Sequence, residues 1–154
     1  TEIYTLSLHD ALPIYPLSYP FSKGIERYVA IDKDRRAIDT LAIFSRVLQG
    51  RLVPICADIG ERDWAWKNTG KEKFDMAFFL KLVPVLHRQS RNVLPLLCRV
   101  PASRILITAS SQAMTREKDI SRRENRILME FIKMTRREIV SPFRIENEFG
   151  YLIE

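Results

Sequence analysis

The sequence is poor in glycine, cysteine and histidine, and each shortage narrows what the protein can be. Only five of its 154 residues are glycine, and the first is Gly24. The two cysteines, Cys56 and Cys98, lie inside apolar runs, which suits reduced core residues better than a disulfide or a metal site. The two histidines, His9 and His87, cannot build a metal-binding group, so no metal is expected.

The sequence also lacks any apolar run as long as a membrane span, so we expect a soluble protein without a membrane partner, and the reduced cysteines suit a cytoplasmic one. A content of 46% hydrophobic and 29% charged residues is typical of one globular domain. The net charge is +6, and the segment Arg116–Arg137 holds eight Lys or Arg against four Asp or Glu. That placement fits a phosphate-rich partner, and it equally fits a solvated helix face with pairs such as Arg126 with Glu130.

Residues 1–14, TEIYTLSLHDALPI, resemble one reading frame of a widely used sequencing adapter. They have no charged n-region and no long apolar core, so they do not form a secretory signal. The alternative is an ordinary N-terminal strand and turn. On the adapter interpretation, residues 15–154 are the C-terminal part of a longer protein.

Apolar runs typical of strands alternate along the chain with amphipathic stretches typical of helices. Strands are predicted at Tyr28–Asp32, Leu52–Ala57, Phe74–Leu80 and Arg104–Ala109, and a closing hairpin at Ile139–Ile145 and Phe149–Ile153. Helices are predicted at Arg35–Gln49, at Val85–Cys98 and from Ser121 onward, and loops at Gly60–Lys73, with a short helix, and at Ser110–Ile120. This order predicts an α/β, Rossmann-like fold that ends in an antiparallel hairpin.

Local signals fix two of the helix starts. Asp34 is placed to cap the first helix, and Ser121 with Glu124 three residues later forms a capping box for the last. Pro84 is expected to set a turn before the middle helix, which Pro95 would kink.

The most informative stretch is Phe74–Gln89, FDMAFFLKLVPVLHRQ. Its dense apolar run suits a strand that is covered on both faces, as in a parallel sheet. Lys81 follows that strand directly, at the carboxyl end where such sheets bind ligands. The alternative is a lysine that only extends its ammonium group to the surface.

Within this stretch, FFLKLVPVLHRQ resembles the F/LLLKxLPxLxxQ segment of the 16S rRNA methyltransferases that confer aminoglycoside resistance. The end of the chain, RIENEFGYLIE, is similar to the closing xIxNELxYxI hairpin of that family, and Pro16-Leu17 resembles the last two residues of its GCGxNPL turn. The resemblance implies a SAM (S-adenosylmethionine) methyltransferase domain, truncated before or within the first strand and its glycine-rich turn. It also implies a preceding helical domain that docks on the ribosome. Residues 3–8 alternate enough to take the place of the missing strand.

The resemblance assigns cofactor contacts to five residues. Asp32 would hold the ribose hydroxyls, and Asp58 with Ile59 would hold the adenine. Leu80 would contact the adenosine and Gln89 the bound cofactor. A helix-cap role for Asp32 and a turn role for Asp58, before Gly60, are the structural alternatives.

The same resemblance implies transfer of a methyl group to guanine N7 in 16S rRNA of the 30S subunit, by a monomer. Lys81 would act beside the target base and contact the RNA. The basic charge of the segment that begins at Arg116 predicts further RNA contacts from Arg116, Lys118, Arg122 and Arg123. Guanine N7 carries a lone pair, so no general base is needed, and positioning supplies most of the rate. His87 receives no catalytic role.

The loop from Ser110 to Asn125 departs from the family pattern, which leaves the target nucleotide open. Two alternatives follow: a SAM methyltransferase that acts on another RNA or a small molecule, and a basic α/β module that binds nucleic acid without catalysis. Because no glycine precedes Gly24, the chain as given is expected not to turn over.

Overall fold

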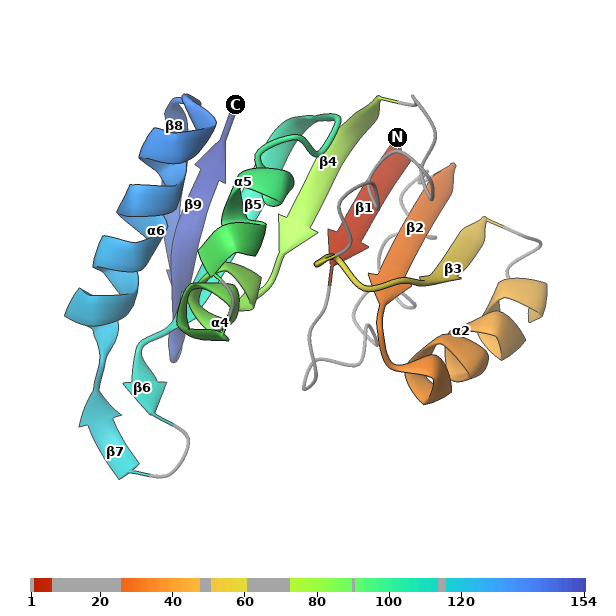
Figure 1. Ribbon diagram of the computed structural model, residues 1–154, viewed down its shortest axis with the longest axis horizontal. Coiled ribbons are helices and arrows are strands. Elements are labelled where there is room, and N and C mark those ends of the chain that lie inside the picture. Colours follow the sequence, from red (N-terminus) through yellow and green to blue (C-terminus); the bar gives the residue numbers. More distant parts are fainter. Residues whose placement is uncertain (1, 7–25, 48–50, 61–72, 90, 114–115) are drawn as a thin grey trace.

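A seven-stranded sheet with the strand order β3-β2-β1-β4-β5-β9-β8 forms the centre of the molecule (Figure 1). The computed structural model describes residues 2–6, 26–47, 51–60, 73–89, 91–113 and 116–154. The strands are β1 Glu2–Leu6, β2 Arg27–Asp32, β3 Leu52–Cys56, β4 Phe74–Phe79, β5 Ala102–Ser110, β8 Ile139–Ile145 and β9 Glu148–Ile153. β1 to β5 pair in parallel, and β9 and β8 join them antiparallel, which confirms the predicted α/β fold and its closing hairpin.

β1 occupies the centre of the parallel part. Ile3 pairs with Tyr28 of β2 on one side and with Met76 of β4 on the other. This is the position predicted for residues 3–8, of which 7 and 8 lie outside the described residues. Residues 2–6 thus supply the backbone of the strand between β2 and β4.

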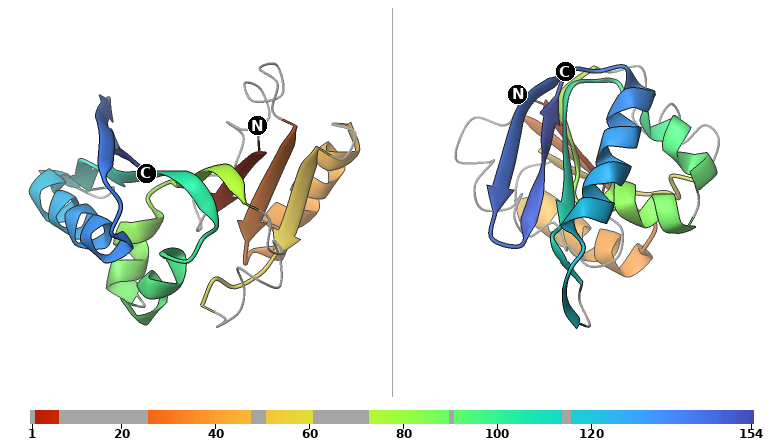
Figure 2. Two further views of the ribbon diagram at one scale, coloured as in Figure 1. Left: turned by 90° about the horizontal axis from the view of Figure 1, so that it is seen from above. Right: turned by 90° about the vertical axis from the view of Figure 1, so that its left-hand side faces the viewer.

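Helices cover both faces of the sheet. The helical elements are α2 Arg35–Val47, α4 Leu82–Gln89, a 3₁₀ turn at Arg91–Val93, α5 Leu94–Leu97 and α6 Ser121–Thr135. α4, α5 and α6 lie together on one side of β4, β5 and β9 (Figure 2). α2 packs Ile38 and Leu41 against the other face of β2 and β3.

Side-chain alternation along β2 divides the core. Val29 and Ile31 point into the large cluster that α4, α5 and α6 cover, whereas Tyr28 and Ala30 point into the small cluster under α2. In the large cluster, the ring of Phe131 on α6 meets that of Phe79 edge to face, with centroids 6.1 Å apart. β2 is therefore buried on both faces, as expected of a central parallel strand.

Three predictions about local structure were wrong. α4 begins at Leu82 and not at Val85, because Pro84 falls in its first turn, where its missing N–H would have no intrahelical partner. The loop Ser110–Ile120 contains a small hairpin, β6 Gln112–Ala113 with β7 Arg116–Asp119. Cys56 is exposed and is no core residue, although both cysteines are free as predicted. Most of the predicted loop Gly60–Lys73 lies outside the described residues.

The capping box at the start of α6 was also wrong. The carboxylate of Asp119 accepts the hydrogen bond from the Ser121 amide at 2.8 Å, so Asp119 takes the place expected of Ser121. Glu124 is 2% exposed and binds Arg88 and Arg123 instead. A buried carboxylate gains more from two guanidinium partners than from one backbone amide, which explains the difference.

Candidate functional site

Three of the residues selected from the sequence lie at the carboxyl edge of the sheet, where β2, β3 and β4 end. Asp32 is the last residue of β2 and pairs with Cys56, the last residue of β3. Asp58 follows β3 by two residues, and Lys81 follows β4 by two. This edge is the ligand-binding position of parallel α/β sheets.

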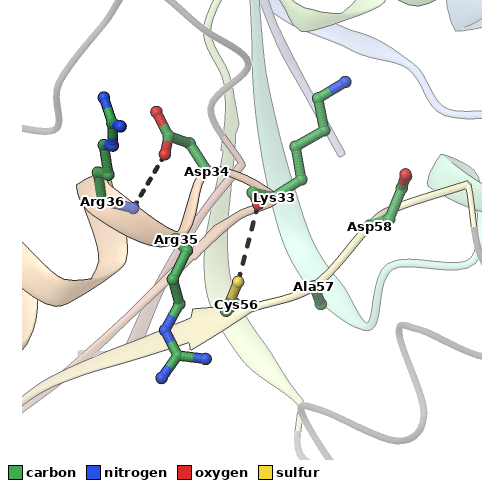
Figure 3. Close-up of a pocket in the computed structure, with 7 residues that line it drawn as sticks. All are labelled: Lys33, Asp34, Arg35, Arg36, Cys56, Ala57 and Asp58. Atoms are coloured by element: carbon green, nitrogen blue, oxygen red, sulfur yellow. Dashed lines mark hydrogen bonds between the residues drawn. The ribbon is translucent and has the colours of Figure 1, made fainter.

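An open hollow lies between the ends of β2 and β3 (Figure 3). Lys33, Asp34 and Asp58 extend to one side of the two strand ends, and Arg35 extends to the other. Cys56 also lines the hollow, together with Arg36 and Ala57, and its thiol is directed at the carbonyl oxygen of Lys33 at 3.7 Å. Lys33 and Cys56 were not selected from the sequence, because only the parallel register of β2 and β3 brings them together.

The carboxylates of the aspartates at this edge accept hydrogen bonds from backbone amides two residues further along the chain. Asp32 accepts a hydrogen bond from the Asp34 amide at 2.8 Å, and Asp58 accepts one from the Gly60 amide at 2.7 Å. Asp34 caps α2 as predicted, through the Arg36 amide at 2.9 Å. The turn role of Asp58 is therefore real, and it fixes one carboxylate oxygen toward the backbone and leaves the group at the rim of the hollow.

Lys81 is held in an unusual conformation. Its φ is 56°, a left-handed value that costs a non-glycine residue about 1 kcal/mol. Its amide donates to the hydroxyl of Thr108 on β5 at 3.0 Å. Its ammonium lies 3.4 Å from a carboxylate oxygen of Glu148 on β9, with 54% of the lysine side chain exposed. Strained residues held by several neighbours are frequent at functional sites.

Thr108 and Glu148 were missed by the sequence analysis, although both hold Lys81. Thr108 is buried at 2% exposure inside β5, where a hydroxyl needs a partner. Its distance of 27 residues from Lys81 hides the contact from any local pattern. Glu148 lies in the closing segment RIENEFGYLIE, so the motif was visible but its ion pair was not.

The other proposed cofactor contacts are more dispersed. Leu80 is half-buried directly before Lys81. Ile59 is 7% exposed and belongs to the large core cluster, so its side chain is committed to packing. Gln89 is exposed at the last residue of α4 and does not line the hollow beside Asp58.

The basic residues selected as RNA contacts lie around the start of α6. Arg122 is exposed, whereas Arg123 donates to Glu124 at 2.9 Å while 54% of its side chain remains exposed. Arg116 and Lys118 lie on β7, and their side chains are outside the described part of the chain. Hydrogen bonds from Ser121 hold the pKa of Asp119 below its usual value.

The described ranges contain no group of three His, Cys, Asp or Glu side chains suited to a metal ion, and no helix long and apolar enough to cross a membrane. The ion pair of Arg126 with Glu130, which the sequence suggested, is not the contact that Glu130 makes. Its carboxylate lies 3.4 Å from Nε2 of His87 instead.

Several solved structures share the arrangement of the whole chain. An rRNA methylase from Escherichia coli matches 99% of this chain and 56% of its own length, with a TM-score of 0.71 and 18% identity. The 16S rRNA methylase RmtB matches with a TM-score of 0.71 and 19% identity, over 99% of this chain and 55% of its own. The 16S rRNA methyltransferase RmtF, solved with S-adenosyl-L-homocysteine, matches with a TM-score of 0.70 and 17% identity, over 99% and 55%.

The fold is the Rossmann-like α/β fold of these solved structures and of a SAM-dependent methyltransferase from Aquifex aeolicus. The chain spans a little over half the length of these three structures, and at such identities the likeness is one of fold. No family model matches the sequence. No curated protein matches it either.

Proposed function

We propose that this chain is part of a SAM-dependent methyltransferase that transfers a methyl group to N7 of a guanine in 16S rRNA. The observation that carries the proposal is the gathering of Asp32, Asp58 and Lys81 at one edge of the sheet. The fold shared with RmtB and RmtF supports this choice of substrate, and with it a role in aminoglycoside resistance. Residues 15–154 would belong to the catalytic domain.

The residues present fit the adenosine half of SAM. The carboxylate of Asp32 can accept hydrogen bonds from the ribose hydroxyls, and Asp58 stands one strand away for the adenine amino group. Leu80 would supply apolar contact. Ile59 would act through its backbone because its side chain is buried, and Gln89 would have to approach from the end of α4.

The chain offers fewer groups to bind the methionine half of SAM. No glycine occurs between β1 and Gly24, so no glycine-rich turn lets the backbone approach the ligand after the first strand. We therefore expect the chain as given to bind SAM more weakly than micromolar and not to turn over.

The reaction would place few demands on the side chains. SAM supplies a methyl group on a sulfonium, and guanine N7 attacks it with a lone pair that needs no prior deprotonation. Lys81 would orient the guanine or its phosphate. Its left-handed backbone, Thr108 and Glu148 would fix the direction of the ammonium group. No step in this scheme calls for a metal.

The proposed partner is the 16S rRNA within the 30S subunit, met by a monomer in the cytoplasm. Arg122 at the start of α6 is exposed and able to contact phosphates, and Arg116 and Lys118 on β7 stand nearby in the chain. Arg123 would add a second contact through the part of its guanidinium that Glu124 leaves open.

A decisive test compares the chain as given with a glycine-restored chain, in which residues 1–15 are replaced by a strand and a GCGxN turn before Pro16. Calorimetry should detect SAM binding by the glycine-restored chain only. Methyl transfer to 30S subunits is then followed with labelled SAM, and N7-methylguanine is mapped by borohydride and aniline cleavage. Micromolar SAM binding by the chain as given would contradict the role of the turn. Restored SAM binding without RNA methylation would favour another substrate only if it persists when the preceding helical docking domain implied by the resemblance is also supplied.

A further inference from the structure

A second hollow lies between the start of α6 and the closing hairpin. Its volume is about 310 Å³, which is within the range of small-ligand sites. Arg122 and Asn125 line it from α6, and Phe143, Arg144, Phe149 and Tyr151 line it from β8 and β9. Its described lining residues are all different from those of the hollow beside Asp58.

The hollow is positively charged. Arg122 and Arg144 are exposed, and neither guanidinium donates a hydrogen bond within the part of the chain that the structure describes. Among the described residues, no Asp or Glu lines the hollow. Asp119 interacts with both arginines, but its carboxylate is engaged by Ser121, and its pKa is lowered further by the two arginines. Two exposed guanidinium groups at one hollow suit a phosphate.

The hollow is also aromatic, and its rings are fixed. The hydroxyl of Tyr151 donates to Asn125 at 2.6 Å and ties β9 to α6. The ring of Phe143 lies over Gly150, where an added Cβ would stand 2.9 Å from that ring and would collide with the Ile107 carbonyl oxygen. Phe149 and Tyr151 are half-buried, so their rings keep part of their surface open, whereas Phe143 pairs with Gly150 and places its ring on the opposite face of the hairpin. Such rings are platforms for unpaired bases.

The position of the hollow connects it to Lys81. Phe149 is the neighbour in sequence of Glu148, whose carboxylate meets the Lys81 ammonium. The hairpin turn and the start of α6 both lie at the end of the sheet to which the parallel strands point (Figures 1 and 2). A single strand of nucleic acid that reached Lys81 would therefore pass near the hollow.

We propose that this hollow binds one nucleotide of single-stranded RNA next to the nucleotide held at Lys81. The base stacks on the aromatic rings, and its phosphate is bound by Arg122 and Arg144. The choice of RNA as the ligand rests on the proposed function, whereas the pairing of a stacked base with a phosphate rests on the hollow alone. An unpaired base is required, because a base inside a duplex has both faces covered.

The test measures fluorescence anisotropy of the 154-residue chain with a labelled single-stranded RNA 12-mer and with the matching duplex. Arg122→Ala and Arg144→Ala should each weaken single-strand binding about fivefold to tenfold. Each should reduce the slope of log affinity against log salt by about 0.7, as for one lost phosphate contact. Phe149→Leu, which keeps an apolar side chain against the core and removes the ring, should weaken binding without changing the salt slope. Arg126→Ala, an exposed arginine on the same helix outside the hollow, is the matched control and should change affinity less than twofold.

Equal effects of Arg126→Ala and Arg144→Ala would overturn the proposal, because the helix would then act only through its total charge. Duplex binding as tight as single-strand binding would overturn the stacking. Crosslinking with 5-bromouridine RNA gives a second readout, and it should label the peptide that spans β8 and β9. A label confined to other segments contradicts the site. No assay here contains SAM, so the hollow can be confirmed even if the proposed methylation fails.

Discussion

The two sides of the sheet differ in how well they are packed. On the side of β4, β5 and β9, helix α6 buries Ile127, Leu128, Phe131 and Ile132 along one face. On the side of β2 and β3, helix α2 buries only Ile38 and Leu41, and its Ile43, Phe44 and Val47 are 64%, 42% and 75% exposed. The part around β4, β5 and β9 is therefore expected to contribute most of the stability of the fold. The part around β2 and β3 carries the proposed cofactor edge and has fewer buried contacts.

The largest effect is expected from the centre of the well-packed side. Phe131→Ala should lower the free energy of unfolding by about 3–5 kcal/mol, because it removes a ring that is 1% exposed and leaves a cavity against Phe79. Leu41→Ala on α2 should cost about 2 kcal/mol, at the low end for a buried leucine, because the small cluster has fewer members around it. Urea unfolding of both variants checks this. A Leu41→Ala cost equal to that of Phe131→Ala would break the comparison.

The next largest effect is expected from the ion pairs of Glu124, in the first turn of α6. Arg88→Ala leaves the carboxylate of Glu124, which is 2% exposed, with Arg123 as its one remaining ion-pair partner in the described residues. We expect a loss of about 2 kcal/mol, less than for a buried charge left with no partner. The double variant Arg88→Ala, Glu124→Gln should recover part of that loss, since the uncompensated charge is gone. Chemical denaturation of both variants, with Arg126→Ala as the control, measures the difference.

At the proposed cofactor edge of β2 and β3, a substitution should change SAM binding and not the stability of the fold. In the glycine-restored chain, Asp32→Ala should weaken SAM binding by roughly 1.5–3 kcal/mol through lost charge-assisted hydrogen bonds. Asp39→Ala removes an exposed carboxylate that pairs with Arg35 on α2, and it should leave SAM binding unchanged. Calorimetry of the two variants decides the point. An unchanged affinity in Asp32→Ala would mean that this residue only closes the turn with Asp34.

Between the two sides, Lys81 should affect catalysis more than binding. Lys81→Ala is expected to slow single-turnover methyl transfer at saturating SAM about tenfold or more, while SAM affinity changes little. Arg122→Ala should act on RNA affinity and its salt dependence instead. If Lys81→Ala reacts as fast as the parent while Arg122→Ala is inactive, the two assignments are reversed.

The elements could be predicted from the sequence because they depend on hydrophobic spacing, which is local. The parallel strands, α2 and the closing hairpin all fall within a few residues of their expected bounds. The start of α4 and the small hairpin of β6 and β7 were local errors, whereas the errors around Glu124 and Lys81 come from contacts over long distances in sequence. Glu124 fits a capping box until Arg88, 36 residues away, reaches it. The supports of Lys81 on β5 and β9 were equally hidden, so the sequence located the lysine but not what orients it.

The smallest predicted effect concerns backbone strain within the well-packed side. Arg136 ends α6 with φ at 58°, a left-handed conformation that glycine adopts without cost. Arg136→Gly should therefore raise the free energy of unfolding by about 0.5–1 kcal/mol, whereas Arg126→Gly in the middle of the same helix should lower it by about 1 kcal/mol. The opposite signs separate conformation from charge, since both changes remove one exposed arginine. Thermal unfolding of the two variants measures both changes in stability.

Lys81→Gly extends the test, because φ at 56° predicts a similar gain in stability together with loss of the ammonium group. A stabilised but slower Lys81→Gly would mean that Lys81 bears its backbone strain for function, whereas the strain at Arg136 serves only the helix end.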